Sequence, residues 1–125
     1  MHFDQRTQRA LGEVGLDRDE LRAASDAVVE AVRADARELE AFFDAREAVY
    51  SDMEKAHSSA EFPEHAVESL DVTTHGPEMR GWLRFESWGA FVEDGRILGE
   101  DYVELTLGPP VHARVRFAPD RETLR

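Results

Sequence analysis

The feature that most constrains the fold is a long stretch without helix breakers. Residues 16–62 contain neither glycine nor proline. Apolar side chains recur along this stretch at helical spacing, at Leu21, Val28, Val32, Leu39, Phe42 or Phe43, Val49 or Tyr50, and Met53. One helix over 18–55 would be about 57 Å long at 1.5 Å per residue, against a radius of gyration near 14 Å for a compact domain of this size. We therefore predict a helix over 18–50, a break near Ser51, and a short helix over 52–57, where Ser51 and Glu54 offer a capping box.

The segment before the long helix predicts a shorter one. Apolar residues over 4–14 share one helical face, and Gly15 is suited to end that helix. Asp17 and Glu20 then form the capping box of the long helix.

From Val67 the apolar period changes from helical spacing to two, which predicts strands. The alternating runs are Leu70-Val72-Thr74, Met79-Gly81-Leu83-Phe85, Val103-Leu105-Leu107 and Val111-Ala113-Val115-Phe117. Asp94-Gly95 predicts a hairpin turn, and so do His75-Gly76-Pro77 and Gly108-Pro109-Pro110. Glycines inside the strands, Gly81, Gly89 and Gly99, predict bulges or close backbone approach in a curved sheet.

These patterns predict a single α+β domain over residues 1–125. Its helical part covers about 4–62 and its sheet part about 67–118. The N-terminal helices should pack on one apolar face of a curved antiparallel meander of four or five strands.

Charge is the strongest compositional signal. Asp and Glu number 27 and Lys and Arg 15, a net charge of −12, and Lys55 is the single lysine. Such self-repulsion destabilises a fold in dilute buffer but is screened over about 3 Å in molar salt. We therefore expect a protein of a halophile; an acidic nucleic-acid mimic or a metal-loaded surface is the alternative. Without cysteine, disulfides and thiolate sites are excluded. With no signal peptide or apolar run of membrane length, we expect a cytoplasmic protein outside the membrane.

The first candidate site is an arginine-rich row on the solvent side of the sheet. Arg80, Trp82 and Arg84 alternate on one predicted strand, and Arg114 and Arg116 follow His112 on the last. Guanidinium groups and an indole are suited to bind an anion or a nucleotide. Nucleic acid is expected less than a small anion, because the chain as a whole is acidic. The alternative is cross-strand pairing, which a three-residue turn would arrange as Glu104–Arg114, Tyr102–Arg116 and Thr106–His112. Glu68 and Asp71 would then neutralise Arg80 and Arg84.

The second candidate is a metal site formed by His57, Glu61 and His65, which are four residues apart. Pro63 argues against the continuous helix that would align them. We predict no catalytic residue, because no nucleophile elbow, phosphate loop or dinucleotide motif is present. No cofactor is predicted.

The over-long apolar stripe is the third candidate, either core or the seam of a homodimer. The leading functional expectation is therefore a non-catalytic interaction or small regulatory domain that forms a homodimer. The alternatives are anion or nucleotide binding on the arginine row and a metal-dependent enzyme using the His57–His65 segment.

Three blocks of the sequence resemble a known group of proteins. They are residues 1–11 (MHFDQRTQRAL), 57–67 (HSSAEFPEHAV) and 101–108 (DYVELTLG). They are similar to a family of small acidic hypothetical proteins of halophilic archaea. The resemblance implies a halophilic habitat and assigns no activity, cofactor or site residue.

Overall fold

The computed structural model of the chain describes residues 5–6, 9, 17–53 and 62–125. Of the helix predicted over 4–14, the described residues 5, 6 and 9 are helical. Of the short helix predicted over 52–57, Asp52 and Met53 are described and belong to no regular element. The rest of that predicted helix lies outside the described residues.

The long helix begins where the capping box predicts. Helix α2 spans Arg18–Asp44, and the Asp17 carboxylate accepts a 2.8 Å hydrogen bond from the Glu20 backbone N–H. The prediction that this helix continues to residue 50 is wrong. The helix ends at Asp44, where Arg46 donates to the Phe42 carbonyl oxygen at 2.7 Å and satisfies one of the free carbonyls of the last turn. The apolar residues that extended the helical pattern belong instead to a strand.

That strand, β1 (Ala48–Ser51), closes a barrel. The other strands are β2 (Glu64–His75), β3 (Glu78–Phe85), β4 (Gly89–Gly99), β5 (Tyr102–Leu107) and β6 (Ala113–Ala118), and a short helix α3 (Arg121–Leu124) follows. Neighbouring strands are antiparallel in sequence order, and β1 also pairs with β6. The fold is thus α+β as predicted, but the sheet has six strands rather than four or five, because β1 pairs with both ends of the predicted meander.

The predicted hairpin turn at Asp94-Gly95 is wrong, since both residues lie inside β4. The chain turns instead at Glu100 and Asp101. Gly95 is needed for a different reason. A Cβ on it would lie 2.7 Å from Cδ1 of Leu39 on α2, so the missing side chain lets β4 pass close to the helix.

The predicted curvature of the sheet is confirmed at two glycines. A Cβ on Gly81 would lie 2.1 Å from the Asp71 carbonyl oxygen, and one on Gly89 would lie 2.9 Å from the Leu83 carbonyl oxygen. Strands β2 and β3 therefore approach at Gly81 more closely than a side chain would permit.

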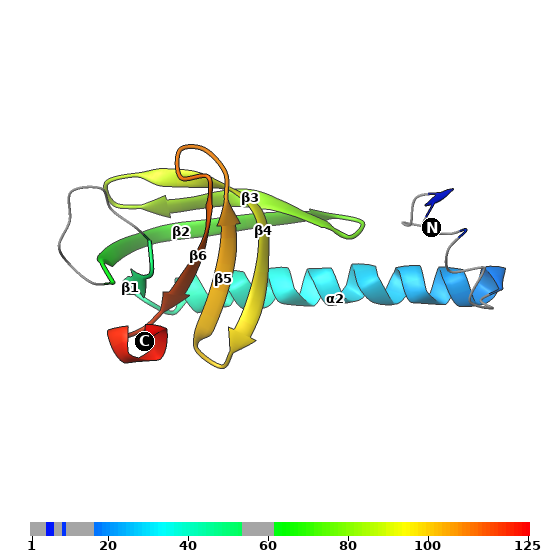
Figure 1. Ribbon diagram of the computed structural model, residues 1–125, viewed down its shortest axis with the longest axis horizontal. Coiled ribbons are helices and arrows are strands. Elements are labelled where there is room, and N and C mark those ends of the chain that lie inside the picture. Colours follow the sequence, from blue (N-terminus) through cyan, green and yellow to red (C-terminus); the bar gives the residue numbers. More distant parts are fainter. Residues whose placement is uncertain (1–4, 7–8, 10–16, 54–61) are drawn as a thin grey trace.

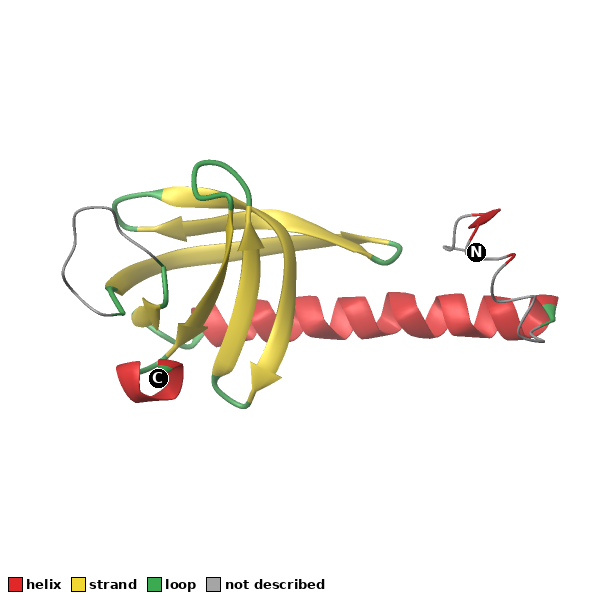
Figure 2. Ribbon diagram, viewed as in Figure 1, coloured by secondary structure: helices red, strands yellow, loops and turns green. Residues whose placement is uncertain are grey.

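Helix α2 packs its C-terminal half against the barrel, and its N-terminal half extends past the strands (Figures 1 and 2). Leu39 and Phe43 are fully buried among the inward side chains of the strands. Leu21, Ser25 and Val29, farther toward the N-terminus, are also buried. Two further residues of the stripe, Val28 and Val32, are half-buried, so the apolar stripe of α2 is covered in part along its described length. No helix in the described ranges is long and apolar enough to cross a membrane.

Candidate functional site

The outer face of β3 carries the predicted row of Arg80, Trp82 and Arg84. The alternate residues of the strand, Met79, Leu83 and Phe85, are buried in the core. Strand alternation therefore points the three predicted residues outward, as the sequence pattern indicates.

Arg80 is held by the backbone. Its Nη1 donates to the Met79 carbonyl oxygen at 2.7 Å and to the Glu93 carbonyl oxygen at 2.6 Å. The neutralising partners predicted for it, Glu68 and Asp71, are not the ones it uses. Arg80 therefore ties β3 to β4 and has fewer donors left for a ligand.

Trp82 is open to solvent. Its exposed fraction is 51%, and it is the one large hydrophobic side chain that is exposed among the residues the structure describes. Its ring packs edge-on against Phe91 of β4, with centroids 5.4 Å apart and planes at 73°. Phe91 thus fixes one edge of the indole, while about half of the side chain stays free to contact a partner.

Arg84, two residues from Trp82 on the same face, is exposed, and its guanidinium makes no hydrogen bond or ion pair with any described residue. It lines an open groove of about 560 Å³, which lies within the size range of small-molecule sites. The other lining residues are Glu68, Trp82, Phe85, Glu86, Ser87, Trp88 and Gly89. The groove thus combines one uncommitted guanidinium with two indoles and two carboxylates; we call it the β3 groove.

Trp88 forms the inner wall of the β3 groove. Its ring packs edge-on against Phe85, 5.0 Å between centroids, and against His65 at 5.6 Å. Because these neighbours are buried, Trp88 is held rigidly, whereas Trp82 is supported on one edge only.

The arginines of β6 lie in a different environment, a ladder of alternating charges. Arg96 of β4 pairs with Glu104 of β5 at 2.8 Å, and Glu104 faces Arg116 of β6. Arg116 in turn pairs with Asp52 at 2.6 Å, and its backbone N–H donates to the same carboxylate at 2.8 Å. The hydrogen bond to Asp52 is the main reason why the pKa of Arg116 is raised. Arg116 is thus committed to the fold.

The cross-strand pairs predicted for this region are displaced by two residues. Glu104 faces Arg116 rather than Arg114, and Thr106 faces Arg114 rather than His112. The cause is the length of the turn, which runs from Gly108 to His112 instead of ending at Pro110. The backbone N–H groups of Val111 and His112 both donate to the Gly108 carbonyl oxygen. Tyr102 still contacts Arg116, through a hydrogen bond from the guanidinium to its hydroxyl oxygen.

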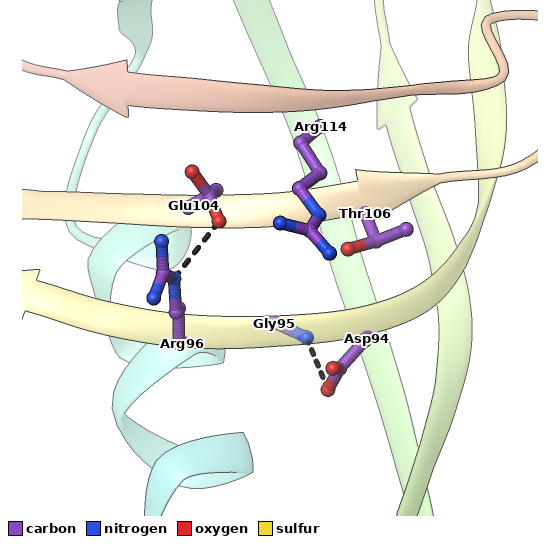
Figure 3. Close-up of a pocket in the computed structure, with 6 residues that line it drawn as sticks. All are labelled: Asp94, Gly95, Arg96, Glu104, Thr106 and Arg114. Carbon is purple, nitrogen blue, oxygen red and sulfur yellow. Dashed lines mark hydrogen bonds and ion pairs between the residues drawn. The ribbon is translucent and has the colours of Figure 1, made fainter.

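Arg114, the other arginine of β6, takes no part in this ladder of ion pairs. It is exposed, and no hydrogen bond or ion pair joins it to the part of the chain that is described. Its guanidinium lies over β5 between Glu104 and Thr106 (Figure 3). Together with Asp94, Gly95 and Arg96, these residues line a pocket of about 170 Å³; we call it the β4–β6 pocket.

The two predicted halves of the arginine row do not come together. In the closed strand order, β3 and β6 are separated by β4 and β5 on one side and by β1 and β2 on the other. The five residues predicted to bind an anion therefore occupy two distant parts of the barrel wall.

His65 is the described member of the predicted metal set, and His57 and Glu61 lie outside the described residues. Its ring is buried and stacked on Phe85, with centroids 4.7 Å apart, and its Nε2 lies 2.8 Å from Oγ of the fully buried Ser51. Within the described ranges, no three His, Asp or Glu side chains converge to hold a metal.

The sequence pattern did not predict Trp88 as a lining residue of a site or Phe91 as the ring that supports Trp82. The outward position of Phe91 follows from strand pairing, which sets it opposite Trp82. No signal in the sequence distinguished the register that pairs Trp82 with Phe91 from registers shifted along the strand.

Comparison with known proteins gives a family but no activity. DUF7532, a family of unknown function, matches residues 1–122. No curated protein and no solved structure matches the chain.

Proposed function

The chain belongs to DUF7532, a family of unknown function, and from its geometry we propose that it is a non-catalytic binding domain. Its binding surface is the β3 groove, and its ligand is a planar aromatic group that carries a negative charge, such as a nucleotide or a single-stranded nucleic acid. The observation that carries the proposal is the pairing of a half-exposed indole, Trp82, with an uncommitted guanidinium, Arg84, on one strand face.

The chemistry of the β3 groove supports this class of ligand. An exposed indole stacks on a nucleobase by about 1–3 kcal/mol. A guanidinium two residues away offers a planar fork to a phosphate group. Glu68 and Glu86 line the same groove and can accept hydrogen bonds from amino groups of a base.

The arrangement of the remaining polar residues favours binding over catalysis. Ser51 and His65 approach within hydrogen-bond distance, but Ser51 is fully buried and His65 nearly so. A nucleophile needs access to its substrate, and this pair has none through the described surface. Metal-dependent catalysis would need His57 and Glu61, and it remains an alternative that elemental analysis of protein purified without chelator tests.

We further propose that the domain works in the salt-rich cytoplasm of a halophilic archaeon. Its net charge of −12 and its single lysine support this habitat. Dissolved ions would also screen the repulsion between the acidic chain and a phosphate group.

The proposal is tested by isothermal titration calorimetry with adenosine monophosphate and a short single-stranded oligonucleotide in 2 M KCl. We expect Arg84→Glu to weaken binding at least tenfold, about 1.4 kcal/mol. Arg37→Glu is the matched control, because Arg37 is an exposed arginine of α2 and the charge change is the same. If neither ligand binds, or if both variants weaken binding equally, the proposal is wrong.

A homodimer is the second candidate function, and the same exposed indole favours it. Tryptophan and arginine are enriched among residues that dominate protein interfaces, whereas the residues of the α2 stripe are buried or half-buried. We propose that a dimer would form through Trp82 rather than through the helix. Light scattering after size exclusion in 2–3 M KCl should then show a dimer that Trp82→Ala converts to a monomer; a monomeric wild type would exclude it.

A further inference from the structure

We propose that the β4–β6 pocket is a second binding site, independent of the β3 groove, and that it takes a small oxyanion such as a phosphate group. Arg114, Arg96 and the Thr106 hydroxyl would hold the anion. The two places lie on different strands of the barrel and share no lining residue.

The donors in the β4–β6 pocket exceed what the fold uses. Arg114 carries five N–H donors, and none is bonded within the described part of the chain. Arg96 uses its Nε for Glu104, and its two terminal nitrogens make no hydrogen bond with the described residues. Arg114 extends from β6 over β5, with Thr106 beside its guanidinium, whereas Arg96 rises from β4 toward Glu104 (Figure 3).

The two carboxylates of the β4–β6 pocket are already engaged. Glu104 pairs with Arg96 at 2.8 Å, and its side chain is only 14% exposed. Asp94 accepts a 2.8 Å hydrogen bond from the backbone N–H of Gly95. With Arg96 and Glu104 paired, the other two charges of the pocket are the Asp94 carboxylate, which accepts the Gly95 N–H, and the Arg114 guanidinium, which has no hydrogen-bond partner among the described residues.

These properties select the class of ligand. Arg114 is the charged lining residue whose side chain has no hydrogen-bond partner, which favours an anion over a cation, and the lining residues include no aromatic ring on which a base or sugar could stack. A guanidinium binds a tetrahedral or planar oxyanion through two parallel hydrogen bonds. A volume of about 170 Å³ exceeds several times the roughly 30 Å³ that a water molecule occupies in liquid, so a phosphate group fits inside, whereas the base and sugar of a nucleotide would lie outside the pocket.

The test is a titration of the full chain with inorganic phosphate at constant ionic strength, followed by NMR of the arginine Nε–H groups. The signal that disappears in Arg114→Gln identifies Arg114. We expect this signal to shift and saturate with phosphate at millimolar concentration. The backbone N–H signal of residue 106 reports binding in every variant, including Arg114→Gln, which lacks the Arg114 signal. Binding should weaken at least tenfold in Arg114→Gln and at least threefold in Thr106→Val. It should be unchanged in Arg37→Gln, which removes the same charge from α2.

The outcomes separate this site from the β3 groove. Unchanged phosphate binding in Arg84→Gln, which removes the guanidinium of the β3 groove, supports a separate site, whereas loss of phosphate binding in that variant overturns it. A shift that does not saturate, or that is equal in Arg114→Gln and Arg37→Gln, also overturns the proposed site. Such a shift would show that phosphate accumulates near the protein without binding at a specific place. Equal affinity for phosphate and for adenosine monophosphate at Arg114 means that the site reads the phosphoryl group alone, as the pocket volume requires. Tighter binding of the nucleotide there contradicts the size argument.

Discussion

Replacing Gly81 by alanine should destabilise the barrel beside its candidate binding surface. The added Cβ would lie 2.1 Å from the Asp71 carbonyl oxygen and 3.0 Å from Cα of Val72. Ordinary contact begins at 3.4 Å, so the closest approach is short by 1.3 Å (3.4 minus 2.1). Both neighbours are backbone atoms of β2, and no side-chain rotation relieves the clash.

The magnitude follows from what must move. Separating β2 from β3 by about 1 Å disrupts one or two ladder hydrogen bonds, each contributing about 0.5–1.5 kcal/mol, and overpacking of this kind costs about 1–3 kcal/mol. Alanine recovers about 0.5–1 kcal/mol, because glycine loses more chain entropy on folding. The free energy of unfolding should therefore fall by about 2 kcal/mol, which corresponds to roughly 8 °C in Tm for a domain of this size.

Urea unfolding followed by circular dichroism in 2 M KCl measures this change. The matched control is Gly99→Ala, whose Cβ would meet only Cβ of Tyr102 at 3.7 Å. Its unfolding free energy should stay within about 0.5 kcal/mol of wild type. If Gly81→Ala is as stable as Gly99→Ala, the close approach of β2 and β3 is wrong.

Three further changes test the electrostatics. Burial, and then the charges of Asp44 and Asp71, raise the pKa of Glu40, so its ionisation destabilises the folded state as the pH rises through that pKa. Glu40→Gln should therefore raise the Tm at pH 7 and leave it unchanged at pH 3. An equal change in Tm at both pH values would show that the charge of Glu40 is not the cause. Asp52→Asn removes the charge that pairs with Arg116 but keeps an acceptor for the Arg116 backbone N–H. The free energy of unfolding should therefore fall by about 1 kcal/mol. An unchanged free energy of unfolding would mean that this ion pair does not stabilise the fold. Lowering KCl from 2 M to 0.1 M should lower the Tm of the wild type, because repulsion within a chain of net charge −12 is then less screened; a constant Tm would contradict the halophilic habitat.

The sequence predicts those parts of the fold that depend on local pattern. The start of α2 follows from Asp17 and Glu20, and β3 and β5 follow from strict alternation. The end of α2 could not be predicted, because Val49 and Tyr50 continue the helical spacing while their strand pairs with residues far along the chain. Pairing of that kind is decided by packing rather than by local propensity.

The candidate site divides in the same way. That Trp82 and Arg84 point outward follows from the period of two. Which arginines are committed depends on register, and the register of β6 was set by Val111 and His112 extending the turn. The separation of Arg84 from Arg114 follows from the meander order, which places β4 and β5 between β3 and β6.

The most direct measurement of the proposed function uses the two tryptophans of the chain. In ¹⁵N-labelled protein, the indole N–H signals of Trp82 and Trp88 report on the two walls of the β3 groove, and Trp82→Phe assigns them. Adenosine monophosphate added in 2 M KCl should shift both signals along one saturating curve, and Arg84→Glu should abolish that shift. If both indole signals stay in place while the nucleotide binds elsewhere, or if it does not bind, the β3 groove is not the binding surface.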